Sequence, residues 1–347
     1  MRVFIGLSGG VDSAVSAALL KEQGHEVIGC FIKIWQPEFI ECSWREDRLD
    51  AMRVAAHLEI PFREIDLSDE YRREVVDTMI SEYERGLTPN PDVLCNRSIK
   101  FGHFFRWAHS EGADFVATGH YARIQRTANS EQRKVKLLRG KDTSKDQSYF
   151  LAQVSEGELR HALFPIGELQ KGAVRSLANK FGLPNATKPD SQGLCFVGEI
   201  TLEDFLMRFI PLQQGPVRDV EGKLVGSHSG AALYTIGQRH GFTISSARGP
   251  HYVIRIDAKE NALVVSPQKE DAAIREVSLK NVHWITKPEL PGHFDVQTRY
   301  REATVRALVS EEAARFDDPH IVAPGQLLVI YNDQHCLGSG SIARIVR

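Results

Sequence analysis

The first 120 or so residues alternate β-branched runs with segments of helical periodicity, and this order constrains the fold more than any other feature. Strands are expected at Val3–Leu7, Glu26–Ile34, Phe62–Leu67 and Phe115–Thr118, and helices at Ala14–Gln23, Glu46–Leu58, Asp69–Tyr83 and Ile99–Ser110. A βαβα order predicts an α/β fold with a doubly wound, Rossmann-like parallel sheet, whose ligands bind at the carboxyl ends of the strands.

The sequence pattern changes after about residue 200, where strand-like segments are separated by Gly, Pro and Asn turns. These segments are Ala232–Ile236, His251–Ile256, Ala262–Val265, Thr304–Leu308 and Gln326–Tyr331. They predict small β-rich modules, including a C-terminal β-barrel. Because 347 residues exceed what one hydrophobic core organises, we predict three domains: a catalytic domain at 1–198, a central domain at 199–267 and a barrel at 268–347.

Composition excludes several classes of protein. No apolar run approaches the roughly 18 residues that a membrane-spanning helix needs. The opening MRVFIGL is too short for a secretory signal and fits a buried first strand, so we expect a cytoplasmic location. The five cysteines are scattered without a C-x-x-C pair, so neither a disulfide framework nor a protein-bound metal site is predicted.

The strongest local signal is SGGVDS, Ser8 to Ser13, which falls where a strand ends and a helix begins. Two glycines let the backbone approach an anion, and the helix that follows directs free N–H groups at it. The pattern therefore favours phosphate binding, although it is not a Walker A loop. The alternative is an ordinary N-cap with Asp12 in the first turn, which would leave both glycines and both serines unexplained.

Two cysteines lie in polar loops. Cys95 follows Thr88-Pro89-Asn90-Pro91-Asp92 and is expected immediately before a helix, close to Arg97 and Lys100, in a setting that favours a reactive thiolate. Cys195 lies in the segment DSQGLCFVG. Each could instead be a small packed hydrophobe. Two loop cysteines on a fold with a phosphate-binding loop suggest sulfur transfer, in which one carries a persulfide and the other displaces the sulfur through a disulfide.

Net charge is −2, but residues 123 to 145 carry a local excess of six positive charges. The basic residues are Arg123, Arg126, Arg133, Lys134, Lys136, Arg139, Lys141 and Lys145. They could follow a nucleic-acid backbone or could be the solvated edge of a hairpin. The remaining cysteines, Cys30, Cys42 and Cys336, are predicted to be structural.

The SGGVDS loop resembles the signature of the PP-loop pyrophosphatases, which split ATP into AMP and pyrophosphate. The whole chain is similar to the bacterial tRNA-specific 2-thiouridylase family. It has GLSGGVDS, TPNPDVLCNRSIKFG, ATGHYAR, KDQSYFL, DSQGLCFVG, YTIGQRHG and TRYRE in the order that the family shows. The resemblance implies ATP-dependent 2-thiolation of the wobble uridine of tRNA, with Mg²⁺ accompanying ATP and a separate protein donating the sulfur.

Residue roles follow from the same resemblance. Cys95 would be the nucleophile and Cys195 the persulfide carrier. Nucleotide binding would fall to Gly6, Leu7, Ser8, Gly9, Gly10, Val11, Asp12, Ser13, Ile32 and Gly119. Contacts with tRNA would fall to Asn90, Pro91, Asp92, His120, Lys145, Asp146, Gln147, Arg299, Tyr300 and Gln326. The family often has methionine where Ile32 stands, but this contact is apolar in either case.

Two other functions remain open at this point. A synthetase or amidotransferase of the same fold would adenylate a small molecule, and it would not need two poised cysteines. A noncatalytic nucleotide-binding module would bind RNA through its barrel-like end, with its thiols serving only for packing. Loss of persulfide chemistry on replacing Cys195 would separate these functions from thiolation.

Overall fold

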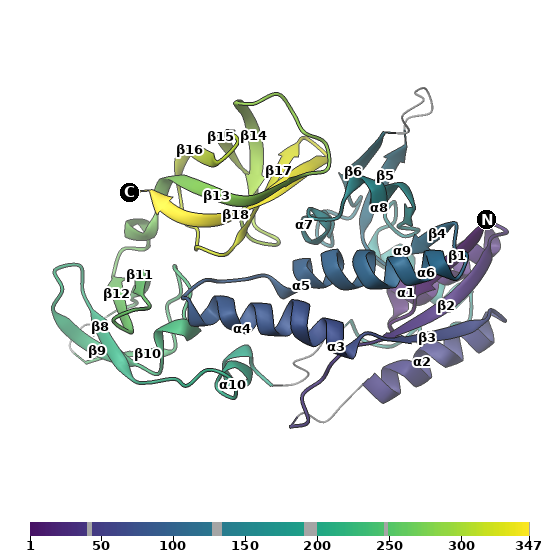
Figure 1. Cartoon of the computed structure of the whole chain (residues 1–347), viewed down its shortest axis with the longest axis horizontal. Coiled ribbons are helices and arrows are strands. Elements are labelled where there is room, and N and C mark those ends of the chain that lie inside the picture. The colour runs from purple at the N-terminus through teal and green to yellow at the C-terminus, as the bar shows by residue number, and fades with distance from the viewer. Residues whose placement is uncertain (40–43, 127–133, 191–199, 246–248, 347) are drawn as a thin grey trace.

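The structure is a computed structural model that describes residues 1–39, 44–126, 134–190, 200–245 and 249–346. Three β-sheets organise it, as Figure 1 shows: a parallel sheet near the N-terminus, a small second sheet, and a barrel that holds the C-terminal strand. No helix among the described residues is long and apolar enough to cross a membrane.

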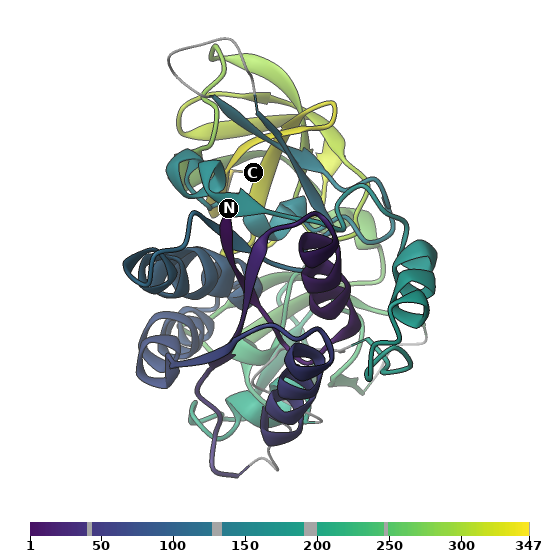
Figure 2. The ribbon, with the colours of Figure 1, turned by 90° about the vertical axis from the view of Figure 1, so that its right-hand side faces the viewer.

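The first sheet is parallel throughout and confirms the predicted doubly wound fold. Its order is β3 (Phe62–Asp66), β2 (Glu26–Lys33), β1 (Arg2–Gly6), β4 (Phe115–Ala117) and β7 (Ala162–Leu163). Figure 2 shows helices on both of its sides. One face packs on α1 (Val11–Glu22), α2 (Trp44–His57) and α9 (Lys171–Lys180).

Two long helices cover the other face. The first runs through α3 (Ser68–Tyr71), η1 (Arg72–Val76) and α4 (Asp77–Glu84). The second runs through α5 (Pro91–Leu94), the π-helical η2 (Cys95–Phe104) and α6 (Phe105–Ser110). Strand alternation sends β1 side chains to both sides, since Val3 and Ile5 face α1 while Phe4 faces the long helices.

Two predictions about local structure were wrong. The helix expected at Ile99–Ser110 begins at Pro91 instead, because the Asn90 side chain accepts hydrogen bonds from the N–H groups of Asp92 and Val93 at 3.1 and 3.2 Å. Proline at the first helical position suits this start. The strand expected at Ala232–Ile236 is replaced by the 3₁₀ turn η3 (Ala231–Leu233), in which Tyr234 N–H bonds the carbonyl of Ala231.

The second sheet has the order β10 (Phe242–Ile244), β9 (Leu224–His228), β8 (Gly215–Arg218), β12 (Ala262–Ser266) and β11 (Tyr252–Asp257). Its own small core contains Val217, Val253 and Leu263, all fully buried. The helix α10 (Leu202–Leu206) precedes it and packs on the first sheet's long helices through Phe205. The predicted domain boundary at residue 198 lies outside the described residues.

The barrel has six antiparallel strands: β13 (Ile274–Trp284), β16 (Ala313–His320), β15 (Val305–Val309), β14 (Gly292–Gln297), β17 (Leu327–Asn332) and β18 (His335–Val346). Pairing of β13 with β18 closes it, which confirms the predicted C-terminal barrel. The η4 turn (Lys269–Ala272) leads into it.

A hairpin from the first part of the chain extends the barrel sheet. Its strands are β5 (Ala122–Arg126) and β6 (Val135–Arg139), and β6 pairs with β18 through His335–Leu138 and Cys336–Leu137. The short helices α7 (Ser148–Leu151) and α8 (Glu156–Arg160) follow the hairpin. The basic residues on β5 and β6 therefore lie in a hairpin at the border between the parallel sheet and the barrel, and Lys141 and Lys145 follow it.

Candidate active site

The SGGVDS loop joins the carboxyl end of β1 to the first turn of α1. Gly9 has φ +75°, and a Cβ atom there would lie 2.5 Å from the carbonyl oxygen of Asp47, so only glycine fits. The Ser13 hydroxyl donates to the carbonyl of Gly10 at 3.0 Å, and the Ser8 N–H donates to Ser13 Oγ at 3.3 Å. The loop is a tight turn at the N-terminal end of a twelve-residue helix, which is the arrangement that favours anions.

Residues from two neighbouring strands approach this loop. A Cβ atom on Gly119, just beyond β4, would lie 2.7 Å from the backbone nitrogen of Ser13, so the chain after β4 passes against the start of α1. Ile32, near the end of β2, lies with its Cδ1 atom 3.9 Å from the Cβ position of Gly6. The structure thus brings the expected nucleotide residues together at one edge of the sheet; that they hold ATP stays a prediction.

Asp12 is the acidic group of the loop, and its carboxylate is fully engaged. Lys171 Nζ lies 2.7 and 2.9 Å from its two oxygens, and the Tyr121 hydroxyl donates to it at 2.8 Å. Burial raises the pKa of Tyr121 far above its usual range, and the negative charge of Asp12 adds to this shift. Tyr121 therefore stays protonated as a hydrogen-bond donor at any physiological pH.

Lys171 also connects Asp12 to Asp190. Its Nζ lies 2.7 Å from Asp190 Oδ1, while Lys145 and Arg175 lie 2.9 and 2.6 Å from the same carboxylate. Burial raises the pKa of Asp190, but the hydrogen bonds and charges of Lys171 and Lys145 outweigh it and hold that pKa far below its usual range. Three cations and two carboxylates thus form one network beside the loop, with a formal charge of +1 from these five groups.

Sequence reasoning did not assign a role to Lys171, Tyr121 or Arg175. One signal was present for Lys171, which is the first residue of α9. A cation at a helix N-terminus is disfavoured by the helix dipole unless an anion compensates for it. Here Asp12 and Asp190 supply that compensation.

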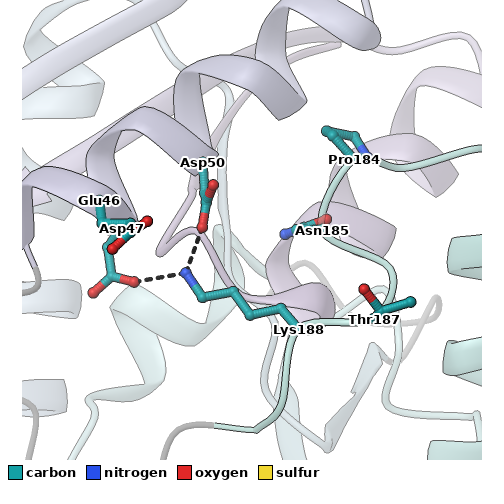
Figure 3. Close-up of a pocket in the computed structure, with 7 residues that line it drawn as sticks. All are labelled: Glu46, Asp47, Asp50, Pro184, Asn185, Thr187 and Lys188. Atoms are coloured by element: carbon teal, nitrogen blue, oxygen red, sulfur yellow. Dashed lines mark hydrogen bonds and ion pairs between the residues drawn. The ribbon is translucent and has the colours of Figure 1, made fainter.

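A cavity of about 350 Å³ lies beside the SGGVDS loop. Its lining comes from α2 and from the segment after α9, and it comprises Glu46, Asp47, Asp50, Pro184, Asn185, Thr187 and Lys188 (Figure 3). Lys188 Nζ lies 2.8 Å from Asp47 and 2.6 Å from Asp50, and the Asn185 side chain donates to the carbonyl of Gly9 at 2.8 Å. These bonds tie the chain just before Asp190 to the loop and to α2.

Cys95 lies in the second turn of the helix that starts at Pro91, not immediately before a helix as expected. Its residue exposure is 8%, and it belongs to the same apolar cluster that Ile32 packs against. Asp92, one turn earlier, is partly buried, and burial raises the pKa of its carboxyl group. The free N–H groups of the helix end therefore do not lie at Cys95, and the electropositive setting and reactivity expected of this thiol stay a prediction.

The other cysteines divide into two groups. Cys30 and Cys336 are fully buried, and burial raises the pKa of both thiols well above their usual range, which fits the structural role predicted for them. Cys195 and Cys42 lie outside the described residues. Cys195 follows Asp190 by five positions.

Apart from Asn90, Pro91 and Asp92 at the start of the Cys95 helix, the residues expected to contact tRNA occupy two places. His120 is 6% exposed, with Nδ1 2.7 Å from the Thr118 hydroxyl, and burial lowers its pKa well below the usual value. Asp146 is also buried and accepts from the N–H of Gly140 at 2.9 Å, and Gln147 Oε1 accepts from the N–H of Tyr121 at 2.9 Å. These side chains brace the turns near the loop in this structure.

The second place is at the edge of the barrel. Arg299 donates to the carbonyl of Ile236 at 2.9 Å, and Gln326 Oε1 accepts from the N–H of Ala323 at 3.1 Å. The Tyr300 ring lies 4.3 Å from the Phe150 ring, centroid to centroid. Arg299, Tyr300 and Gln326 are all partly exposed.

The basic residues of the hairpin segment do not all face solvent. Arg139 bonds Asp146 at 2.9 Å and lies over the Tyr331 ring, while Arg123 Nε donates to the carbonyl of Arg139 at 2.6 Å. Lys134, Lys136 and Lys141 are exposed, and Arg133 lies outside the described residues. The surface available to an RNA backbone is therefore smaller than the charge count suggests.

Comparison with known proteins agrees with this arrangement. Residues 1–199 match the family described as tRNA methyl transferase HUP domain, residues 203–267 its PRC-barrel domain, and residues 274–342 an aminomethyltransferase β-barrel domain. The chain is 42% identical over its full length to the tRNA-specific 2-thiouridylase MnmA of Geobacillus thermodenitrificans, of which it covers 95%. It is 40% identical to the enzyme of that name from Lysinibacillus sphaericus, again over 100% of this chain and 95% of the relative.

A solved structure of NMN synthetase from Francisella tularensis is similar over 58% of this chain and 71% of that chain, with 16% identity and a TM-score of 0.35, too low to support a functional inference. Fold and loop define an α/β enzyme of the HUP class that carries a second β-sheet and a closed β-barrel. Within that class the chain belongs to the tRNA-specific 2-thiouridylase family of sulfurtransferases.

Proposed function

We propose that this protein replaces the C2 oxygen of the wobble uridine of tRNA with sulfur, using ATP to activate that oxygen and a cysteine persulfide to deliver the sulfur. The observation that carries the proposal is the position of Cys95. Its helix packs on the same face of the sheet as Ile32, and Phe104 of that helix lies with Cε1 4.0 Å from the Cβ position of Gly6, two residues before the SGGVDS loop. A thiol and an anion-binding loop at one edge of the sheet suit a reaction that both adenylates and thiolates one base.

ATP would lie across the carboxyl ends of β1, β2 and β4, with its phosphates at the start of α1. The Gly9–Gly10 turn and the free N–H groups of the helix support phosphate binding there. Lys171, Lys145 and Arg175 add positive charge beside the loop. We propose that these cations stabilise the pyrophosphate that leaves when the uridine O2 attacks the α-phosphorus.

Mg²⁺ would reach the site with ATP. Among the described residues no group of three His, Cys, Asp or Glu side chains could hold a metal ion. Asp12 is a suitable carboxylate ligand, but both of its oxygens bond Lys171. The ion would supply charge neutralisation on the phosphates, while this chain's own residues orient the nucleotide.

Sulfur would arrive on Cys195 as a persulfide formed by a donor protein. In one route the terminal sulfur attacks C2, the C2–O bond breaks and AMP leaves with the former O2. Cys95, as a thiolate, then attacks the S–S bond, so that sulfur stays on the base and a Cys95–Cys195 disulfide forms. In the other route Cys95 first releases hydrosulfide, which attacks C2. Either route needs an external thiol reductant to regenerate both cysteines.

Chain connectivity supports the placement of Cys195. Five residues span at most about 18 Å, and Asp190 is fixed to Asp12 through Lys171. On this basis we propose that Cys195 acts near the loop. The target base must be unstacked to expose C2, and Asn90, Pro91 and Asp92 at the helix start are proposed to contact it.

The decisive test is mass analysis of the nucleosides of tRNA incubated with the purified protein, ATP and sulfide. Replacement of one oxygen by sulfur in the wobble uridine, absent without ATP, supports the proposal. Pyrophosphate release that is independent of tRNA would favour adenylation of a small molecule instead. Tight tRNA binding with no pyrophosphate release would favour a noncatalytic RNA module.

A further inference from the structure

The segment that leads into the Cys95 helix is held by both β-rich parts of the molecule. The Thr88 N–H donates to the carbonyl of Pro324 in the barrel at 2.8 Å. Its hydroxyl lies 3.2 Å from the hydroxyl of Thr235, in the segment that follows η3. Thr88 is therefore bonded on two sides by elements that lie more than 140 residues away in sequence.

Glycines let these elements approach closely. Gly325 has φ +89°, and a Cβ atom there would lie 2.6 Å from the backbone nitrogen of Thr88. Gly86 has φ +72°, and its Cβ position is 3.0 Å from the Cβ of Ala258, in the turn between β11 and β12. No side chain larger than hydrogen fits at position 325 without moving the Thr88 backbone.

The same contact includes two of the residues expected to bind tRNA. Gln326 braces the turn that presents the Pro324 carbonyl, because its Oε1 accepts from the N–H of Ala323 at 3.1 Å. Arg299 donates to the carbonyl of Ile236, the residue after Thr235, at 2.9 Å. A closed ring of contacts thus joins the barrel edge, the second sheet and Thr88.

Thr88 is rigidly connected to the helix. Pro89 restricts the backbone of Thr88 to extended conformations and has a fixed φ of its own. Pro91 has the same two effects on Asn90 and on itself. Between them, Asn90 caps the helix by accepting from the N–H groups of Asp92 and Val93. A displacement of Thr88 therefore passes to the helix start rather than being absorbed by the chain.

We propose that Thr88 is a positioning residue for the reaction, through which the barrel and the second sheet fix the entry of the Cys95 helix. This inference deepens the proposed function and rests on it, since it gives the two β-rich parts a role in placing the thiol. RNA that contacts Arg299 or Gln326 then acts on the same ring of contacts that holds the helix. Thr88 itself does not touch the reacting atoms.

The test compares two glycine-to-alanine substitutions at positions with nearly the same positive φ, so that the backbone strain of the two variants is similar. Gly325→Ala forces a Cβ atom onto Thr88, whereas Gly222→Ala, at φ +86° in the β8–β9 turn, meets nothing within 4 Å. We expect amide hydrogen exchange at Asp92, Val93 and Leu94 to become at least about fivefold faster in Gly325→Ala, the factor that corresponds to one ordinary hydrogen bond. In Gly222→Ala the exchange at these amides should equal that of the wild type.

Threonine variants supply the catalytic measurement. Thr88→Val should lower kcat for thiolation while leaving the KM for ATP unchanged, and Thr88→Ser, which keeps the hydroxyl, should restore kcat. Equal exchange rates at the helix start in Gly325→Ala and Gly222→Ala would overturn the inference. Because exchange is measured without ATP or RNA, that result is independent of whether the protein thiolates tRNA. Faster exchange in Gly325→Ala, together with no thiolation by the wild type, would reject the proposed function and with it the role of Thr88 in positioning the thiol.

Discussion

Lys171 bonds both carboxylate oxygens of Asp12 from a position 159 residues further along the chain. The same ammonium group reaches Asp190, so the glycine loop and the segment leading toward Cys195 share one cation. The charge balance of the loop therefore depends on Lys171 and Asp190, which lie outside the SGGVDS motif. The effect of a substitution in the loop depends on the same two residues.

Asp12→Ala should reduce pyrophosphate release in the presence of tRNA by roughly 100-fold or more, the range seen when one preorganised electrostatic group is lost from an active site. The fold should remain intact, because Lys171 keeps Asp190 as a partner. Glu22→Ala is the matched control, an exposed acidic residue at the other end of α1. Pyrophosphate release by Asp12→Ala close to that of the wild type would contradict the role in ATP activation proposed for the whole loop.

Cys95→Ser and Cys195→Ser should each eliminate thiolation, whereas Cys42→Ser should leave it unchanged. In the wild type, a single turnover without added reductant should produce a Cys95–Cys195 disulfide, detectable by peptide mapping. A map that lacks this bridge while thiolated tRNA accumulates would count against disulfide formation in the reaction.

Replacing Arg133, Lys134 and Lys136 with glutamine should weaken tRNA binding and reduce the dependence of log affinity on log salt by roughly two units, because each phosphate contact contributes about 0.7 to 0.9. The loss should be similar for substrate and non-substrate tRNAs, since these side chains would read no bases. Affinity for ATP should not change. Glutamine at the exposed Lys259, Lys269 and Lys280 is the control, and an equal salt slope in both triple variants would mean that RNA is held elsewhere.

Asp190→Asn should change the acid sensitivity of the protein. The pKa of Asp190 is lowered on folding, so its ionised form stabilises the native state at every pH above the unfolded value of about 4. This stabilisation is lost as the pH falls from 4 through the folded pKa. Urea unfolding should therefore show a constant advantage of the wild type from pH 7 to about pH 4 and a shrinking one below it. An advantage that persists unchanged below pH 3 would show that the carboxylate charge is not its source.

The features of the fold that are determined by local residue patterns could be predicted from the sequence. The βαβα order and the glycines of the SGGVDS loop need only their neighbours to be interpreted, and both the parallel sheet and the position of the loop are confirmed. The helix start at Pro91 was also encoded locally, in the Asn90 cap followed by proline, but two prolines in a polar stretch favoured a loop interpretation.

Other features depend on contacts between residues far apart in the chain, which produce no periodic pattern in the sequence. The apolar run Ala232–Ile236 has strand composition, yet it passes between the second sheet and Thr88, where Thr235 bonds across the junction instead of along a strand. The pairing of Lys171 with Asp12 and Asp190 joins residues from three separate segments. Such pairs are set by the tertiary fold, so only the structure reveals them.

The pairing of β6 with β18 has a consequence for biosynthesis. Leu137 and Leu138 belong to a hairpin whose strand partners, Cys336 and His335, are synthesised about 200 residues later. Until then the hairpin presents an open strand edge, the kind of edge that pairs with foreign chains. The parallel sheet can form before these partners exist, whereas the hairpin can complete its sheet only after residue 336 has been made, which makes the nascent protein most vulnerable to aggregation in that interval.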